Sequence, residues 1–116
     1  MLYPSQEFVN NFVDKFLYLK PILKEHIEDY DEILPHVFLG EIAKWCVANY
    51  KNSSQENVQQ IFEYIEQTFK NGGEEIQELI SVSFLENLSN QNEDERKILK
   101  YLGPELLSEF KKINKI

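Results

Sequence analysis

The chain has 116 residues, 42% of them hydrophobic, a single cysteine and a formal net charge of −8. A chain of this mass buries about two-thirds of its unfolded surface on folding, so it fits one domain over residues 1–116 that needs no disulfide or metal ion to support its core. The single cysteine excludes an intramolecular disulfide, and no apolar run approaches the length of a membrane span. Because the first residues carry no secretory signal pattern, we expect a cytoplasmic protein.

Apolar residues recur at helical spacing in the first half of the chain. Pro4 and Ser5 predict the start of a first helix. Its predicted apolar face consists of Phe8, Val9, Phe12, Val13, Phe16 and Leu17. Pro21 begins a second predicted helix. The residues that follow at helical spacing are Ile22, Leu23, His26, Ile27 and Tyr30. Pro35 begins a third and central helix that runs to residues 51–52.

The second half of the chain continues this pattern. A fourth helix follows Ser53 and Ser54, and its narrow apolar stripe is Val58, Ile61, Phe62, Ile65 and Phe69. We expect Gly72 and Gly73 to end it, because glycine tolerates left-handed backbone angles. A fifth helix carries the apolar residues Ile76, Leu79, Ile80, Phe84, Leu85 and Leu88 and ends at residues 89–90. A Gly-Pro pair at 103–104 separates a short helix from the last one. Since no segment alternates like a strand, the predicted fold class is all-α, a compact and partly orthogonal bundle of six to seven short helices.

The central helix holds most of the scarce reactive residues. A helical wheel places Cys46 in the apolar arc, Trp45 at its edge, and His36 and Gly40 on the opposite side. A buried thiol behaves as a small hydrophobe with a raised pKa, so we do not expect Cys46 to act as a nucleophile. We expect Trp45 to be mostly buried. Glycine inside a helix costs about 1 kcal/mol relative to alanine, and a close backbone contact with another helix, or with the chain entering at Ile33, would explain Gly40.

The two histidines leave open a small metal-binding or hydrolytic enzyme that uses His26, His36 and nearby carboxylates. This alternative predicts that His36 approaches Glu32 or Glu41 in a cleft. Against it, His26 and Asp29 share a helix face, but two ligands do not make a metal site. The Glu-x-x-His motif of di-iron bundles is also absent from the sequence. We therefore assign no catalytic, cofactor-binding or metal-binding residue.

The negative charge is concentrated in the middle of the chain. Residues 53–95 contain ten acidic side chains and one basic side chain, whereas residues 96–116 contain six basic and two acidic ones. Phosphate groups are bound by clustered Lys and Arg, so this distribution argues against nucleic acid or an anionic membrane as the partner. A basic protein partner is favoured by the charge, and a solvated acidic face is the plainer interpretation. The candidate partner contacts are Glu63, Glu66, Glu74, Glu75 and Glu78.

Three segments resemble a family of small, uncharacterised bacterial helical proteins. They are Leu34-Pro35-His36-Val37-Phe38-Leu39-Gly40-Glu41-Ile42 through Trp45, Ser83-Phe84-Leu85-Glu86-Asn87-Leu88, and Leu102-Gly103-Pro104-Glu105-Leu106. The family is a domain of unknown function with no established activity, cofactor or substrate. The resemblance therefore implies a single helical domain and assigns no site residue.

Three hypotheses follow for function. The leading one is a non-enzymatic acidic domain that binds a basic protein, in its most specific form an immunity or antitoxin-like inhibitor of a basic bacterial nuclease toxin. The second is the histidine-based enzyme or metal-binding protein described above. The third is a homodimerising structural module that uses surplus aromatic residues. Those residues are Tyr3, Tyr18, Tyr64 and Tyr101.

Overall fold

The computed structural model describes residues 4–51, 55–88 and 93–115. It is 86% helical, and the described residues form seven α-helices and no strand, which confirms the predicted all-α class. The α-helices are α1 (Pro4–Lys15), α2 (Lys20–Tyr30), α3 (Pro35–Asn49), α4 (Gln55–Asn71), α5 (Glu74–Leu79), α6 (Glu93–Ile98) and α7 (Pro104–Ile113). Shorter turns complete them: the 3₁₀ turns η1 (Leu17–Leu19), η3 (Leu85–Asn87) and η4 (Leu99–Tyr101), and the π turn η2 (Ile80–Phe84).

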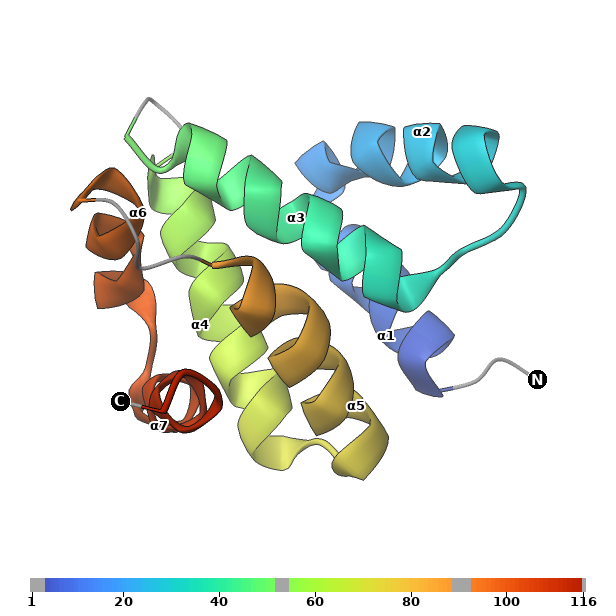
Figure 1. The fold of residues 1–116 in the computed structure, drawn as a ribbon. Coiled ribbons are helices and arrows are strands. Elements are labelled where there is room, and N and C mark those ends of the chain that lie inside the picture. The colour runs from blue at the N-terminus through green and yellow to red at the C-terminus, as the bar shows by residue number, and fades with distance from the viewer. Residues whose placement is uncertain (1–3, 52–54, 89–92, 116) are drawn as a thin grey trace.

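The helices cross at steep as well as shallow angles. In Figure 1, α4 and α5 run side by side, α3 crosses above them, and α7 is seen end-on. Helices α1 and α2 lie on one side of α4, and α6 and α7 lie on the other. The radius of gyration of 13.5 Å matches the value of about 13.4 Å expected for a compact chain of this length. The bundle is therefore compact and partly orthogonal, and none of its described helices is long and apolar enough to cross a membrane.

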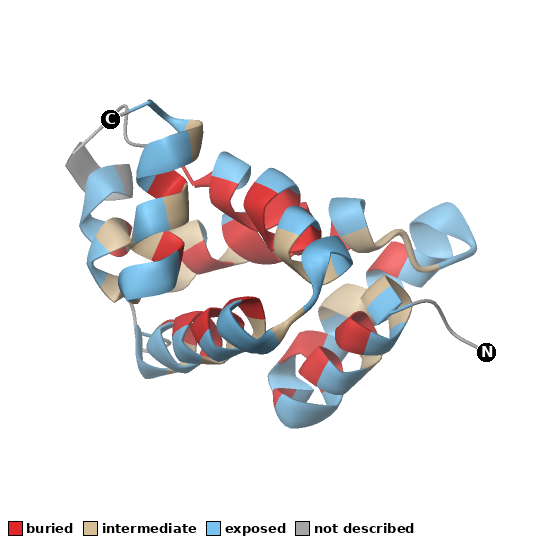
Figure 2. Cartoon of the chain, turned by 90° about the horizontal axis from the view of Figure 1, so that it is seen from below, coloured by how far each residue is buried: buried red, intermediate tan, exposed pale blue. Residues whose placement is uncertain are grey.

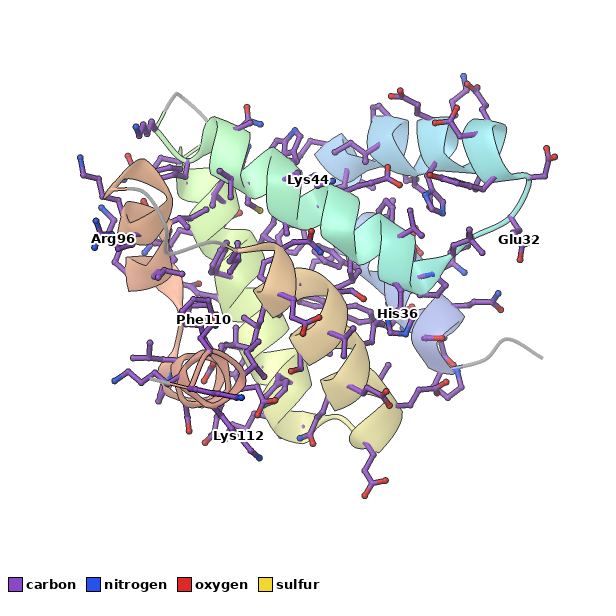
Figure 3. All side chains as sticks on the ribbon, viewed as in Figure 1. Glu32, His36, Lys44, Arg96, Phe110 and Lys112 are labelled. Carbon is purple, nitrogen blue, oxygen red and sulfur yellow. The ribbon has the colours of Figure 1, made fainter. Side chains whose placement is uncertain are left out.

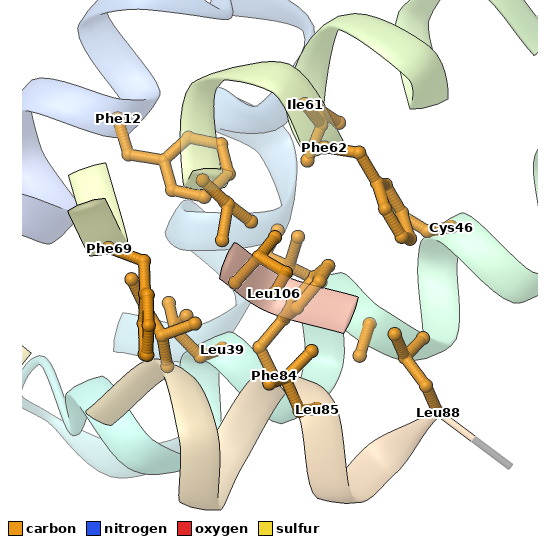
Figure 4. Close-up of a cluster of buried hydrophobic side chains, with 14 of the residues drawn as sticks. Phe12, Leu39, Cys46, Ile61, Phe62, Phe69, Phe84, Leu85, Leu88 and Leu106 are labelled. Carbon is orange, nitrogen blue, oxygen red and sulfur yellow. The ribbon is translucent and has the colours of Figure 1, made fainter. Parts of the chain in front are cut away.

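Buried apolar side chains meet between the helices in one cluster, with the exposed faces turned outward (Figures 2 and 4). Its largest fully buried members are Phe12, Phe38, Phe62, Phe84 and Phe110, each from a different element. The Cys46 side chain lies in this cluster with no exposed surface. As predicted, burial raises the pKa of the Cys46 thiol well above its ordinary range.

The first helix ends earlier than its apolar pattern predicts. Helix α1 stops at Lys15, and Phe16 leaves the helical conformation with φ −120° and ψ 83°. Leu17 is 60% exposed, so its predicted place on the apolar face was wrong. Pro21 explains the break, because a proline ring inside a continuous helix would clash with the carbonyl four residues earlier, at Leu17. The chain makes the turn η1 instead and restarts as α2.

Helix α2 is covered less than its sequence predicts. Within α2, which is described in full, His26 alone is buried, while Ile27 is 39% and Tyr30 is 45% exposed.

A second departure from the prediction concerns Gly72 and Gly73. Helix α4 ends at Asn71, as predicted, but neither glycine has a positive φ, so left-handed backbone angles are not the reason. Gly72 instead permits a close approach, because a Cβ there would lie 2.7 Å from the Thr68 carbonyl oxygen.

The predicted fifth helix changes its winding twice. It begins as α5, widens into the π turn η2, and ends as the 3₁₀ turn η3. A π turn accommodates one extra residue without breaking the helix, and it shifts the direction of the side chains that follow. Within it, Ser81 donates a hydrogen bond to Glu109 Oε2 at 2.8 Å, and Ser83 is buried against α3.

Candidate functional site

Three of the predicted partner contacts lie on α5, with Glu74 and Glu75 in its first turn and Glu78 in the next turn. Gly73 is the N-cap of this helix and has no side chain to bond its first N–H groups. Acidic side chains in the first turn compensate, because they stabilise the positive end of the helix dipole. All three glutamates are exposed, and none lies within ion-pair distance of a basic side chain in the described residues. We call these three residues the α5 acidic surface.

Glu66 does not belong to this surface. It is 8% exposed, and its carboxylate accepts hydrogen bonds from the backbone N–H groups of Glu105 at 3.0 Å and Leu106 at 2.9 Å. These are the second and third residues of α7, the positions that an N-cap side chain normally bonds. The N-cap residue of α7 is Gly103, which has no side chain. Glu66 therefore caps α7 from α4, and the expectation that it contacts a partner is corrected.

Gly103 makes this cap possible. A Cβ at residue 103 would lie 2.4 Å from Cδ and 2.7 Å from Cγ of Glu66, distances that the two groups cannot adopt. Its φ of −74° is accessible to any residue, so the requirement for glycine is space and not backbone angle. The Gly-Pro junction that the sequence indicates thus leaves space for the Glu66 carboxylate of α4 at the start of α7.

Glu63 lies apart from the α5 acidic surface, on the wall of a groove between η1 and α4. At 1.5 Å per residue, it is about 12 Å along the helix axis from the end of α4 at Asn71. The groove encloses about 750 Å³. The residues that line it are Lys15, Phe16, Leu17, Tyr18, Gln60, Glu63, Tyr64 and Gln67. We call this feature the η1–α4 groove.

Aromatic rings form much of the η1–α4 groove. The rings of Phe16 and Tyr64 meet edge to face with centroids 5.6 Å apart, and Lys15 Nζ lies 5.9 Å from the Tyr64 centroid. Tyr18 stacks on Trp45 at 5.8 Å. Burial, followed by the proximity of Cys46, raises the pKa of Tyr18 to about 12. Trp45 packs against the core but is only partly buried, so the expectation that it is mostly buried is met in part.

His26 is fully buried and links three segments of the chain. The backbone N–H of Leu34 donates to His26 Nε2 at 2.9 Å, so the ring proton lies on Nδ1 and is donated to Glu41 Oε1 at 2.7 Å. Its ring also lies edge to face against Phe38. Both ring nitrogens are therefore used to join α2, the α2–α3 connection and α3, and His26 has no surface for a substrate.

His36 makes a separate contact with the π turn. Its Nδ1 lies 2.5 Å from the hydroxyl oxygen of Ser83, which is 4% exposed. One turn along α3, a Cβ on Gly40 would lie 3.1 Å from Nδ2 of Asn87, and this amide donates to the Ser83 carbonyl at 2.6 Å. Gly40 therefore lies against another helix, as predicted. The contact also brings together two of the segments that carry the family resemblance.

The histidine-based enzyme requires His36 to approach Glu41 or Glu32. His36 and Glu41 line the same polar pocket of about 300 Å³, but the Glu41 carboxylate is hydrogen-bonded to His26. Glu32 extends from the α2–α3 connection away from His36 (Figure 3). The described residues contain no group of three or more His, Cys, Asp or Glu placed to hold a metal ion.

The sequence predicted the α5 acidic surface but not the η1–α4 groove. Tyr18 and Tyr64, proposed as dimer contacts, both line this groove, whereas Tyr101 does not line it and accepts a hydrogen bond from Gln55. Tyr3 lies outside the described residues. The sequence did contain one signal for the groove. Pro21 requires a break in the helix before it, and this break leaves Leu17 outside the first helix.

Comparison with known proteins identifies one family. Residues 9–116 match the family described as Domain of unknown function (DUF7674). No curated protein and no solved structure matches the chain. Because the match covers nearly the whole sequence, the chain belongs to the DUF7674 family, a domain of unknown function.

Proposed function

We propose that this domain is a non-enzymatic protein that binds a basic protein through the α5 acidic surface. The observation that carries this proposal is the arrangement of Glu74, Glu75 and Glu78, three exposed carboxylates within two helical turns and without a basic neighbour in the described residues. Like charges three and four residues apart on a helix repel one another. A Lys or Arg side chain from a partner would relieve this repulsion, and the surface is open to receive it.

In its most specific form, the partner is a basic nuclease toxin and this domain is its inhibitor. A nuclease binds phosphates through clustered cationic side chains, and those same side chains attract carboxylates. The charge of residues 53–95, ten acids against one base, supports this form. Such a field would speed association with a cationic active site at low ionic strength.

The non-enzymatic part of the proposal is supported by how the histidines are used. His26 is buried with both ring nitrogens bonded, whereas His36 is exposed and its Nδ1 is bonded to the buried Ser83 hydroxyl and not to a carboxylate. A general base must reach the proton that it abstracts from a substrate. Elemental analysis that found a stoichiometric metal ion in the purified protein would refute this part.

The binding surface can be tested with two triple variants that remove the same charge. The first is Glu74→Gln/Glu75→Gln/Glu78→Gln in α5. The matched control replaces three exposed glutamates near α2, as Glu25→Gln/Glu28→Gln/Glu32→Gln. Where a basic nuclease is encoded beside this gene, that nuclease is the probe, and binding is measured by calorimetry at low and high salt.

We expect the α5 variant to bind about tenfold more weakly, since three exposed ion pairs are each worth about 0.2–1 kcal/mol. The α2 control should bind nearly as tightly as the parent, and the difference should shrink at high salt. Equal losses in both triple variants would show that only net charge matters and would refute the assigned surface. Gene neighbourhoods without any basic nuclease across several genomes would refute the toxin form.

A further inference from the structure

The η1–α4 groove has an apolar side chain standing at its edge. Leu17 is 60% exposed, the largest exposed fraction among the large apolar residues that the structure describes. The opposite wall is one face of α4, formed by Gln60, Glu63, Tyr64 and Gln67, which follow the i, i+3, i+4, i+7 spacing of a helix face. On this face Tyr64 is partly covered by the rings of Phe12 and Phe16, whereas the other three side chains are exposed. The chain therefore presents an apolar projection and an apolar recess next to each other.

The charges of the groove differ from those of the whole chain. The lining contains one base, Lys15, and one acid, Glu63, so it is neutral in a chain of net charge −8. The two residues lie on opposite walls, and neither forms an ion pair in the described structure. Two copies of an acidic protein repel one another over most of their surfaces. The neutral groove is a face on which two copies can approach without that repulsion.

We propose that two copies of this chain associate through the η1–α4 groove. In a two-fold arrangement the same patch is used on both copies, so each contact occurs twice. Leu17 enters the groove of the partner subunit, and Lys15 faces Glu63 of the partner subunit. Charge complementarity thus selects a second copy of this chain as the occupant.

The size and composition of the groove suit this occupant. A volume of about 750 Å³ lies within the range of about 300–1,000 Å³ that encloses a drug-sized ligand, so it accommodates Leu17 and part of a neighbouring side chain. Tyr18 and Tyr64 supply the aromatic surface that protein interfaces favour. Because the patch is small, we expect a weak dimer that depends on concentration. The proposal is independent of the α5 acidic surface, since it uses none of Glu74, Glu75 and Glu78.

The first test measures mass in solution by sedimentation velocity from low micromolar to near-millimolar protein. The parent should rise from 13.8 kDa toward twice that mass. Leu17→Glu should remain a monomer throughout, because it places a charge in the apolar recess. Val82→Glu is the matched control, since Val82 is 44% exposed in the π turn and does not line the groove. Circular dichroism confirms that each variant is folded.

The second test uses the pairing of opposite charges. Lys15→Glu alone and Glu63→Lys alone should each be monomeric, because each places like charges opposite one another at both contacts. An equal mixture of the two variants should form a dimer again, since every contact then pairs a lysine with a glutamate. The α5 triple variant should dimerise like the parent, which separates this proposal from the proposed function.

Three results would overturn the proposal. In the first, the parent remains at 13.8 kDa at every concentration. This is also the result expected if the groove binds a different protein and not a second copy. Val82→Glu dissociates the dimer as fully as Leu17→Glu, which would place the contact elsewhere. The mixture of the two charge variants stays monomeric while the parent dimerises, which would exclude the pairing of Lys15 with Glu63 of the partner subunit.

Discussion

Replacing Glu66 with alanine should destabilise the protein far more than an exposed glutamate in α4 would. The substitution removes both oxygens that accept the N–H groups of Glu105 and Leu106, at 3.0 and 2.9 Å. A helix N-cap is worth about 1 kcal/mol, and a hydrogen bond to a charged group about 1.5–3 kcal/mol. Part of this gain is offset, because the buried carboxylate no longer has to be desolvated. We therefore expect the free energy of unfolding to fall by about 3 kcal/mol, a large share of the roughly 5–15 kcal/mol of a typical domain.

Urea unfolding followed by circular dichroism measures this change. Glu63→Ala is the matched control, because Glu63 lies on the same helix, is exposed and has no bonded partner in the described chain. Its stability should stay within about 0.5 kcal/mol of the parent. Glu66→Gln keeps one acceptor oxygen but loses the charge, so it should fall between the two. Hydrogen exchange should show faster exchange of the Leu106 amide in Glu66→Ala.

The outcome that would refute the reasoning is specific. If Glu66→Ala and Glu63→Ala unfold at the same urea concentration with the same slope, the carboxylate does not stabilise the start of α7. The capping assignment would then be wrong, and Glu66 would return to the candidate contacts of a partner.

Three further predictions concern the core. Trp45→Ala should lower the free energy of unfolding by about 1–3 kcal/mol, less than the roughly 3–5 kcal/mol lost with a fully buried aromatic residue. A larger decrease in the free energy of unfolding, measured by urea denaturation, would mean that Trp45 belongs to the core. His26→Ala should cost about 2–4 kcal/mol, because it leaves the Leu34 N–H without its acceptor; an unchanged melting temperature would contradict this. Burial holds the pKa of Cys46 above its ordinary value of 9.0, so the unfolded thiol ionises first and stability, complete below pH 9, should fall as pH rises above it. Urea midpoints on either side of pH 9 should show a smaller fall in Cys46→Ala than in the parent.

The helices could be predicted because their apolar residues follow the helical period. The stripe of α4 is the clearest example, since Val58, Ile61, Phe62, Ile65 and Phe69 are all buried in the structure. Such a pattern records which face of each helix is covered. The pattern contains no information on which element covers that face, so the crossing angles of the helices could not be predicted from it.

The burial of Glu66 could have been predicted from the same pattern. Glu66 stands four residues after Phe62 and three before Phe69, so it lies within the apolar stripe and not on the solvated face. A carboxylate at such a position needs hydrogen-bond donors. Its donors are on α7, about forty residues further along the chain, and only the tertiary structure identifies them.

The histidine contacts and the groove were beyond sequence reasoning for the same physical reason. The spacing around His36 suggested a carboxylate partner, but the partner is Ser83, 47 residues away, while Glu41 is bonded to His26 on a different helix. The groove depends on where η1 lies against α4. Local spacing limits which residues share a face, and long-range packing decides which faces meet.

The cap on α7 also bears on the order in which the chain folds. Helix α7 has ten residues, fewer than the roughly 12–15 at which an isolated helix becomes even marginal in water, and its N-cap glycine contributes no side chain. The carboxylate that completes it arrives only when α4 is in place, after a loop of about forty residues has closed. We therefore expect helix formation and docking of α7 to occur together and late in folding. Substitutions in this helix should accelerate unfolding while leaving the folding rate nearly unchanged, and partial opening of α7 would uncover Phe110 while the rest of the bundle stays folded.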